Sequence, residues 1–186
     1  MKAFVGDAIL PEAMALEIEQ VLLGFRFPWH YYPNTNARDL QTNVGDAPQF
    51  VHGFIQNEKR FSQFANVPEA IIERMGLPKN EIIRAKANIL GRDREPLVHP
   101  AHTDDQDPHW VLIYYVNDSD GDTCLFEGDE VIQRITPKRG RVLVFDRLIR
   151  HASSSPVQTP FRCVFNFNLK PTLQESQFEK LLQKVG

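Results

Sequence analysis

Short strand-like runs separated by turn-rich stretches fill the chain from Ile82 onward, and this pattern restricts the fold more than any other feature of the sequence. The turn-rich stretches, at 117–122 and 153–156, are built from Asn, Asp, Ser, Gly and Pro. The run at 161–169 alternates apolar and mostly polar residues, as a strand does when its two faces meet different surroundings. Many short strands between such turns predict a mainly β fold in the form of a double-stranded β-helix, or jelly roll.

Helical patterns flank the strand-rich region on both sides, which makes the predicted class α+β. The helices expected in the first 80 residues are 11–23, 57–66 and 68–75. The apolar side chains expected to pack on the sheet from the last two are Phe61, Phe64, Ile71, Ile72 and Met75. No repeat or linker divides the chain, so we expect one domain over 1–186. Its parts are a helical N-terminal support at 1–80, the jelly-roll core at 81–170 and a C-terminal helix at 171–186.

A possible metal site consists of the tripeptide His102-Thr103-Asp104 and a histidine, His151, that follows it at the end of another strand-like run. Residues two positions apart on an extended segment project to the same side, so His102 and Asp104 can reach one ion. Two imidazoles and one carboxylate can occupy one face of an octahedral metal and leave the other positions open, as in non-haem Fe(II) oxygenases. By itself this tripeptide is a weak signal, because such spacings also arise by chance.

Arg162 strengthens the interpretation of the three residues as a metal site. It shares one face of the 161–169 strand with Asn166 and Asn168. The simplest interpretation is that this polar face meets water. Alternatively, the planar guanidinium grips a carboxylate through two parallel hydrogen bonds. A dicarboxylate cosubstrate that chelates the metal at one end would need such an anchor at the other.

These residues, in this order, resemble the motif of the Fe(II)- and 2-oxoglutarate-dependent dioxygenases, and within them the prolyl-4-hydroxylase-like branch of small phage and bacterial type. Three further strings support the resemblance, and they are Ile-Tyr-Tyr-Val-Asn at 113–117, Gly-Asp-Thr-Cys-Leu-Phe at 121–126, and the approach to the second histidine at 137–146. Together these strings cover about the last half of the chain.

The resemblance implies that His102, Asp104 and His151 ligate iron and that Arg162 binds the distal carboxylate of 2-oxoglutarate. The implied cofactors are Fe(II), 2-oxoglutarate as cosubstrate, and O2. The implied reaction couples decarboxylation of 2-oxoglutarate to succinate with hydroxylation of a C–H bond, on a prolyl or other peptide side chain or on a small molecule. Mn, Co, Ni or Zn can also occupy such ligands.

Two further residues are implied as contacts to the cosubstrate. Tyr115 would assist Arg162, and Asn88 matches a position that often carries a polar contact. In many relatives a serine stands two residues after the arginine, whereas this chain has Val164. A second contact to the carboxylate would therefore come from Tyr115. The alternatives are that Tyr115 is a core aromatic and that Asn88 satisfies only local hydrogen bonds.

Aromatic residues gather at 27–33, and a second stretch with aromatic residues and a histidine follows at 49–54. Both stretches resemble N-terminal segments of small phage and bacterial oxygenases of this superfamily. They either wall the substrate pocket or pack helices against the barrel.

Two other function classes stay open. The first is an oxygenase of the same chemistry that demethylates a nucleobase, which would need a base-flipping pocket and a basic groove. The formal net charge of −3 argues against this class and against nucleic-acid partners in general. The second is a catalytically silent, cupin-like protein that binds a metal or small molecule. Arg162 argues against it, because a site that holds only a metal has no need of this residue.

The sequence also indicates the cellular environment. No apolar run approaches the roughly 20 residues that span a bilayer, so no membrane partner is expected. The first residues lack the pattern of a signal peptide. The two cysteines, Cys124 and Cys163, lie on predicted strands, where buried free thiols are common. These features predict a cytoplasmic protein.

Overall fold

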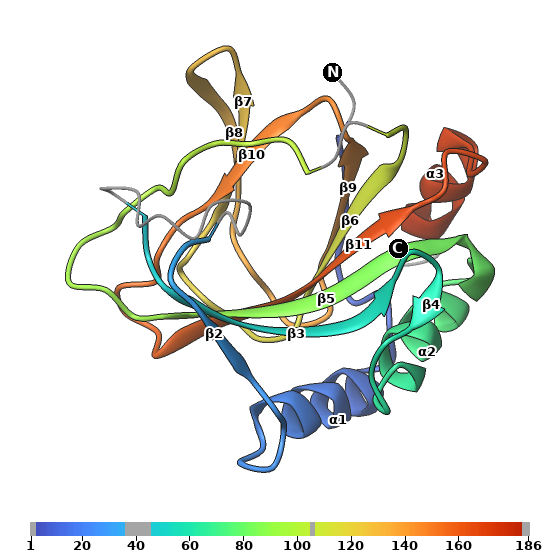
Figure 1. Ribbon diagram of the computed structural model, residues 1–186. Coiled ribbons are helices and arrows are strands. Elements are labelled where there is room, and N and C mark those ends of the chain that lie inside the picture. Colours follow the sequence, from blue (N-terminus) through green and yellow to red (C-terminus); the bar gives the residue numbers. More distant parts are fainter. Residues whose placement is uncertain (1–2, 36–45, 105–106, 184–186) are drawn as a thin grey trace.

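The computed structural model describes residues 3–35, 46–104 and 107–183. Within these residues, antiparallel strands form two sheets that face each other, and helices cover the outer face and one end of the larger sheet (Figure 1). This arrangement confirms the predicted mainly β jelly roll with flanking helices. In the part of the chain that the structure describes, no helix has the length and apolarity that a bilayer span requires.

The larger sheet contains eight strands. In spatial order its main path is β1 (Ala3–Gly6), β9 (Val142–Asp146), β6 (Trp110–Tyr115), β11 (Phe161–Leu169), β5 (Ile82–Gly91), β3 (Gln49–Gln56) and β2 (His30–Tyr32), and β4 (Lys59–Arg60) pairs with β3. The smaller sheet has the order β10 (Arg150–Ser153), β7 (Thr123–Glu127) and β8 (Glu130–Ile135). Isolated antiparallel bridges, Val98 to Ser154 and His102 to His151, attach the segment before Asp104 to the free edge of β10.

The alternation along β11 determines which side chains face the interior of the jelly roll. Phe165 and Phe167 point to the outer face and are fully buried in the core under the helices. Arg162, Val164 and Asn166 point to the inner face, between the two sheets. One strand therefore supplies both the apolar core and polar groups of an internal pocket.

Three α-helices and a short 3₁₀ helix pack around the larger sheet in the described residues. They are α1 (Glu12–Leu23), α2 (Asn66–Arg74), η1 (Lys79–Glu81) and α3 (Glu175–Gln183). Helices α1 and α2 lie on the outer face of the larger sheet, whereas α3 lies beside β1 (Figure 1). The predicted helix at 11–23 is confirmed. A C-terminal helix is also present, but it begins at Glu175 and not at 171 as predicted, and residues 184–186 lie outside the described residues. The helix predicted at 68–75 is observed about two residues earlier.

The helix predicted at 57–66 is wrong. Asn57 and Glu58 have φ values of 49° and 62° and form a two-residue turn between β3 and β4. Such left-handed conformations belong to tight hairpins and not to helices. Phe61, which we expected to pack on the sheet, is 79% exposed. The N-terminal region also contributes β1, β2, β3 and β4 to the larger sheet, whereas the prediction for residues 1–80 was a helical support.

Candidate metal centre and adjoining pocket

His102 and His151 lie directly opposite each other on neighbouring extended segments. The amide of each donates a hydrogen bond to the carbonyl of the other, at 3.0 Å from His102 and 2.9 Å from His151. This pairing places the two imidazole ring centroids 4.8 Å apart. The backbone ladder therefore fixes the spacing of the two rings.

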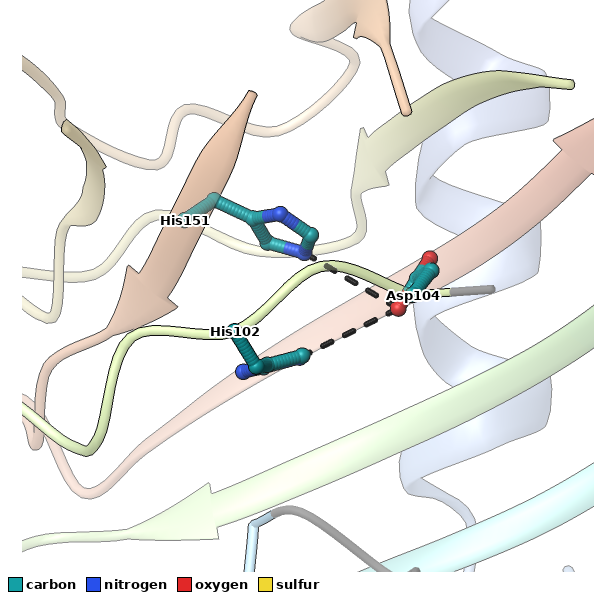
Figure 2. A group of neighbouring side chains, drawn as sticks. All are labelled: His102, Asp104 and His151. Atoms are coloured by element: carbon teal, nitrogen blue, oxygen red, sulfur yellow. Dashed lines mark ion pairs between the residues drawn. The ribbon is translucent and has the colours of Figure 1, made fainter. Parts of the chain in front are cut away.

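Asp104 completes the group from the same segment as His102, as residues two positions apart on an extended chain should. Its Oδ1 atom lies 3.9 Å from Nε2 of His102 and 3.9 Å from Nε2 of His151. One ligand atom from each of the three residues lies within 4.8 Å of the others. Figure 2 shows both rings directed toward the carboxylate. The three predicted metal ligands thus share one site.

The hydrogen bonds of the two imidazoles leave the facing nitrogens available to a metal. Nδ1 of His102 lies 3.3 Å from the carbonyl oxygen of Pro100, and Nδ1 of His151 lies 3.2 Å from that of Ile149. A ring that donates from Nδ1 carries its lone pair on Nε2. Burial lowers the pKa of His151 to about 4, so this ring is neutral at physiological pH. The donor set therefore suits a divalent cation.

Asp104 is held in its charged form by nearby cations. Its Oδ2 atom lies 3.2 Å from Nη2 of Arg84, which leaves Oδ1 directed at the histidines. Burial opposes ionisation, but the charge that His151 carries in the acid range where the carboxyl titrates, together with the charges of Arg84 and Lys86, holds the pKa of the carboxyl below its usual range. A monodentate carboxylate ligand is consistent with this arrangement.

Arg162 lines a narrow pocket of about 60 Å³ that also includes His102 and His151. The side chain is 4% exposed, and burial lowers its pKa. Nη2 donates a hydrogen bond to Oγ1 of Thr123 at 2.7 Å, whereas the buried Nε has no hydrogen-bond partner. Among the residues that the structure describes, no carboxylate lies within ion-pair distance of Arg162. A buried cation of this kind is costly unless a ligand supplies the negative charge.

Tyr115 contacts Arg162 both directly and through Thr123. The Tyr115 hydroxyl donates to Oγ1 of Thr123 at 2.8 Å, and the guanidinium carbon of Arg162 lies 5.8 Å from the centre of the tyrosine ring. Tyr115 is fully buried, and burial raises its pKa to about 12, so it stays protonated as a donor. Gly121 packs so closely that a Cβ there would lie 3.1 Å from Cδ of Arg162 and 2.7 Å from the Ser154 carbonyl oxygen.

Asn88 lines the same pocket, as predicted for a cosubstrate contact, but its Nδ2 is occupied. It donates to Oε1 of Gln49 at 2.5 Å. The amide nitrogen of Gln49 in turn donates to the carbonyls of Asn34 at 2.8 Å and Thr35 at 2.7 Å. Asn88 therefore connects the pocket wall to the segment after β2, which agrees with the alternative of a local hydrogen-bonding role.

Thr123 and Lys86 are among the pocket residues to which the sequence assigned no site role. Thr123 was within the string at 121–126, directly after the glycine, and this position was its only signal. Lys86 lies between alternating apolar residues of β5, and that alternation indicated which face of the strand it occupies. Neither signal identified a function.

Neither a protein-family model nor a curated protein matches the sequence. Solved structures do match. An oxidoreductase of the 2OG-Fe(II) oxygenase family from Burkholderia pseudomallei is 13% identical, with a TM-score of 0.66 over 91% of this chain and 85% of that chain. The chain has the fold of the 2OG-Fe(II) oxygenases, where 2OG denotes 2-oxoglutarate.

Two further structures share this fold. A prolyl hydroxylase from Trichoplax adhaerens, in complex with a hypoxia inducible factor peptide fragment, is 15% identical, with a TM-score of 0.59 over 99% of this chain and 87% of that chain. HygX from Streptomyces hygroscopicus, with nickel, 2-oxoglutarate and hygromycin B bound, is 12% identical, with a TM-score of 0.57 over 92% of this chain and 83% of that chain. Identities this low establish the fold, whereas function has to be argued from the site.

Proposed function

We propose that the protein is an Fe(II)- and 2-oxoglutarate-dependent oxygenase that hydroxylates a C–H bond of a peptide side chain or a small molecule. One observation carries the proposal: the buried guanidinium of Arg162 lines the same pocket as His102 and His151, and Asp104 completes the metal-ligand group with these two histidines. A site that holds only a metal requires the His102, Asp104 and His151 group but does not require the guanidinium of Arg162.

Proteins with the same fold support this combination. The HygX structure contains nickel, 2-oxoglutarate and hygromycin B, and the Trichoplax adhaerens prolyl hydroxylase is in complex with a peptide fragment. Both a peptide and a small molecule are therefore reasonable substrate classes for this chain.

In the proposed site, Nε2 of His102, Nε2 of His151 and Oδ1 of Asp104 hold Fe(II). When bound, iron would supply the redox chemistry by which O2 oxidatively decarboxylates 2-oxoglutarate to succinate and CO2 and hydroxylates the substrate. The protein contributes position and charge. The backbone pairing of His102 and His151 fixes two of the ligands, and Arg84 orients the third.

At the other end of the pocket, Arg162 binds the distal carboxylate of 2-oxoglutarate. The oxygen of Thr123 accepts hydrogen bonds from Tyr115 and from Arg162, so its own proton is free to point to a third partner. Thr123 lines the pocket, and it can donate this proton to the same carboxylate. Thr123 thereby takes the place that a serine two positions after the arginine has in many relatives, where this chain has Val164.

The cysteines support the proposed cytoplasmic location. Cys124 and Cys163 are both free and buried, and burial raises the pKa of each thiol. Free thiols persist in a reducing compartment, where Fe(II) is also maintained.

The proposal is tested by anaerobic titration of the Fe(II)-loaded protein with 2-oxoglutarate, followed by the metal-to-ligand charge-transfer absorption. We expect a saturable band in the wild type and release of succinate once O2 is admitted. Arg162→Leu should weaken 2-oxoglutarate binding by at least a hundredfold, because a bidentate charged contact is lost. Arg162→Lys should bind 2-oxoglutarate with an affinity between those of the wild type and Arg162→Leu.

Arg139→Leu is the matched control. Arg139 is an ion-paired arginine on the surface, 2.9 Å from Glu19, and its removal should leave the titration unchanged. Thermal unfolding of each variant reports whether the fold is intact. A wild-type protein that binds Fe(II) but gives no response to 2-oxoglutarate would contradict the proposal and favour a silent metal-binding protein.

A further inference from the structure

A second pocket adjoins the metal pocket on the inner face of β2, β3 and β5, which are hydrogen-bonded neighbours at one edge of the larger sheet (Figure 1). It has a volume of about 340 Å³, which is within the range of pockets that take small ligands. We refer to this pocket as the edge groove. Both pockets include Gln49 and Lys86, so the edge groove opens toward the metal centre at these two residues.

Lys86 is the cation at this junction, and the charge of Asp104 acts on it only from beyond ion-pair distance. Among the described residues, no carboxylate lies within ion-pair distance of its ammonium group. Its neighbours across the sheet are Gly53 on β3 and Asn166 on β11, neither of which carries charge, and Oδ1 of Asn166 is buried without a hydrogen-bond partner. Burial, followed by the charge of Arg84, lowers the pKa of Lys86 to about 8, and at neutral pH the group is still mainly charged.

Arg84, the other cation of the edge groove, is already engaged. It forms an ion pair with Asp104 at 3.2 Å and donates to Oδ1 of Asn168 at 3.0 Å. Lys86 is therefore the group in the edge groove whose charge is available to a ligand. A partly buried ammonium is stabilised most effectively by an anion at contact distance.

Aromatic and apolar side chains form the rest of the edge groove. Phe61 is 79% exposed, and its ring lies over Gly53, with Cδ1 3.6 Å from where a Cβ of that glycine would be. Tyr32 and Val51 line the same space from the two neighbouring strands. An apolar group that covers this exposed ring removes its surface from water, which favours binding of a ligand with an apolar part.

We propose, building on the oxygenase function proposed above, that the edge groove binds the substrate and that this substrate is an acid with an apolar body. Its anionic group pairs with Lys86, and its apolar body packs against Phe61 and Tyr32. Lys86 lies four residues along β5 from Leu90, the residue that pairs with Arg162, so the substrate anion and 2-oxoglutarate use separate cations. The substrate class is thus defined by one charge and one apolar surface.

The test uses protein loaded with Zn(II), which suits the same ligands without redox chemistry, and saturated with 2-oxoglutarate so that Arg162 is occupied. Dissociation constants are measured by ligand-observed NMR titration with 3-phenylpropionate and with its uncharged amide, 3-phenylpropanamide. We expect the acid to bind at least tenfold more tightly than the amide, because hydrogen bonds to charged groups contribute this much or more.

Lys86→Met should remove the preference for the acid, and Lys86→Arg should keep it. Phe61→Ala should weaken the binding of the acid and of the amide by a similar, several-fold factor, because it removes apolar contact and no charge. Lys59→Met, which removes an exposed lysine of the neighbouring strand β4, should leave both constants unchanged. Thermal unfolding checks that each variant is folded.

A second probe pair, the capped dipeptides N-acetyl-Phe-Glu-amide and N-acetyl-Phe-Gln-amide, distinguishes an acidic peptide side chain from a free acid. Tighter binding of the glutamate dipeptide than of 3-phenylpropionate identifies a peptide as the source of the anion. The reverse order identifies a small-molecule acid.

The inference is overturned if acid and amide bind equally, if the acid displaces 2-oxoglutarate, or if Lys86→Met abolishes 2-oxoglutarate binding, which would assign Lys86 to the cosubstrate. These outcomes leave the oxygenase proposal intact as long as the wild type binds 2-oxoglutarate. If 2-oxoglutarate does not bind but the acid still does so through Lys86, the oxygenase proposal fails and the anion site stands.

Discussion

Arg84 holds Asp104 from behind, with Nη2 3.2 Å from the carboxylate oxygen that faces away from the two histidines. Arg84 is on β5, whereas Asp104 lies on the segment next to β10, so this ion pair joins the two sheets beside the metal centre. Nη2 also donates to Asn168 on β11 at 3.0 Å, which fixes the position of the guanidinium. The orientation of the third metal ligand therefore depends on a residue that does not itself bind the metal.

Replacing Arg84 with Met should weaken metal binding by about ten- to a hundredfold, the usual effect of removing a partner of a metal ligand. The variant should bind metal with the same stoichiometry, because all three ligands remain. Competition with a chromophoric chelator measures the affinity. Arg60→Met is the control, since Arg60 forms a similar ion pair with Glu69 on the surface. Equal metal affinity of Arg84→Met and wild type would show that Asp104 is positioned by its own segment alone.

His102→Ala should abolish stoichiometric Fe(II) binding and, with it, the charge-transfer band on addition of 2-oxoglutarate. The remaining His151 and Asp104 offer too few ligands to hold the ion tightly. His30→Ala is the matched control, because this histidine lines the edge groove and takes no part in the metal group. Metal content after gel filtration gives the result. Retention of one equivalent of iron by His102→Ala would place the metal elsewhere.

Thr123→Val should weaken 2-oxoglutarate binding by about tenfold, because the valine neither supports Arg162 nor donates to the carboxylate. The two side chains have nearly the same shape, so the pocket volume is preserved. Thr123→Ser keeps the hydroxyl and should bind like the wild type. Tyr115→Phe removes only the donor to Thr123 and should have a smaller effect. If Tyr115→Phe has the larger effect in the anaerobic titration, the tyrosine is the direct contact.

The sequence predicted the jelly roll and the position of Arg162 because both depend on local alternation. Along β11, each apolar residue on one face requires a polar or small residue on the other, and this periodicity is visible without any tertiary information. The pairing of His102 with His151 was recognisable for a different reason. Their residue types and order match a family motif, and the motif implies that the two segments meet.

The roles of Arg84 and Lys86 could not be predicted in the same way. Each is a charged residue on a strand, a pattern that usually indicates a solvated face. Arg84 is distinguished by its ion pair with Asp104 between the two sheets, and Lys86 by its uncharged neighbours on the adjacent strands. Both sets of neighbours depend on the register of the strand pairing. The hairpin at Asn57 and Glu58 escaped prediction because neither is a glycine, although asparagine tolerates the left-handed conformation.

Lys86→Met should make the protein more stable at neutral pH, by about 1 to 3 kcal/mol, because it removes a partly buried charge that has no ion-pair partner among the described residues. The pKa of Lys86 is about 8 in the folded protein and is higher in the unfolded chain. Between these values the unfolded chain binds more protons, so wild-type stability rises with pH and the advantage of the variant shrinks above pH 8. Urea denaturation from pH 7 to 10 measures this, with Lys79→Met, an exposed lysine paired with Glu73, as the control. A destabilised Lys86→Met variant at pH 7 would mean that the fold itself requires the ammonium group, and that its retention does not reflect ligand binding.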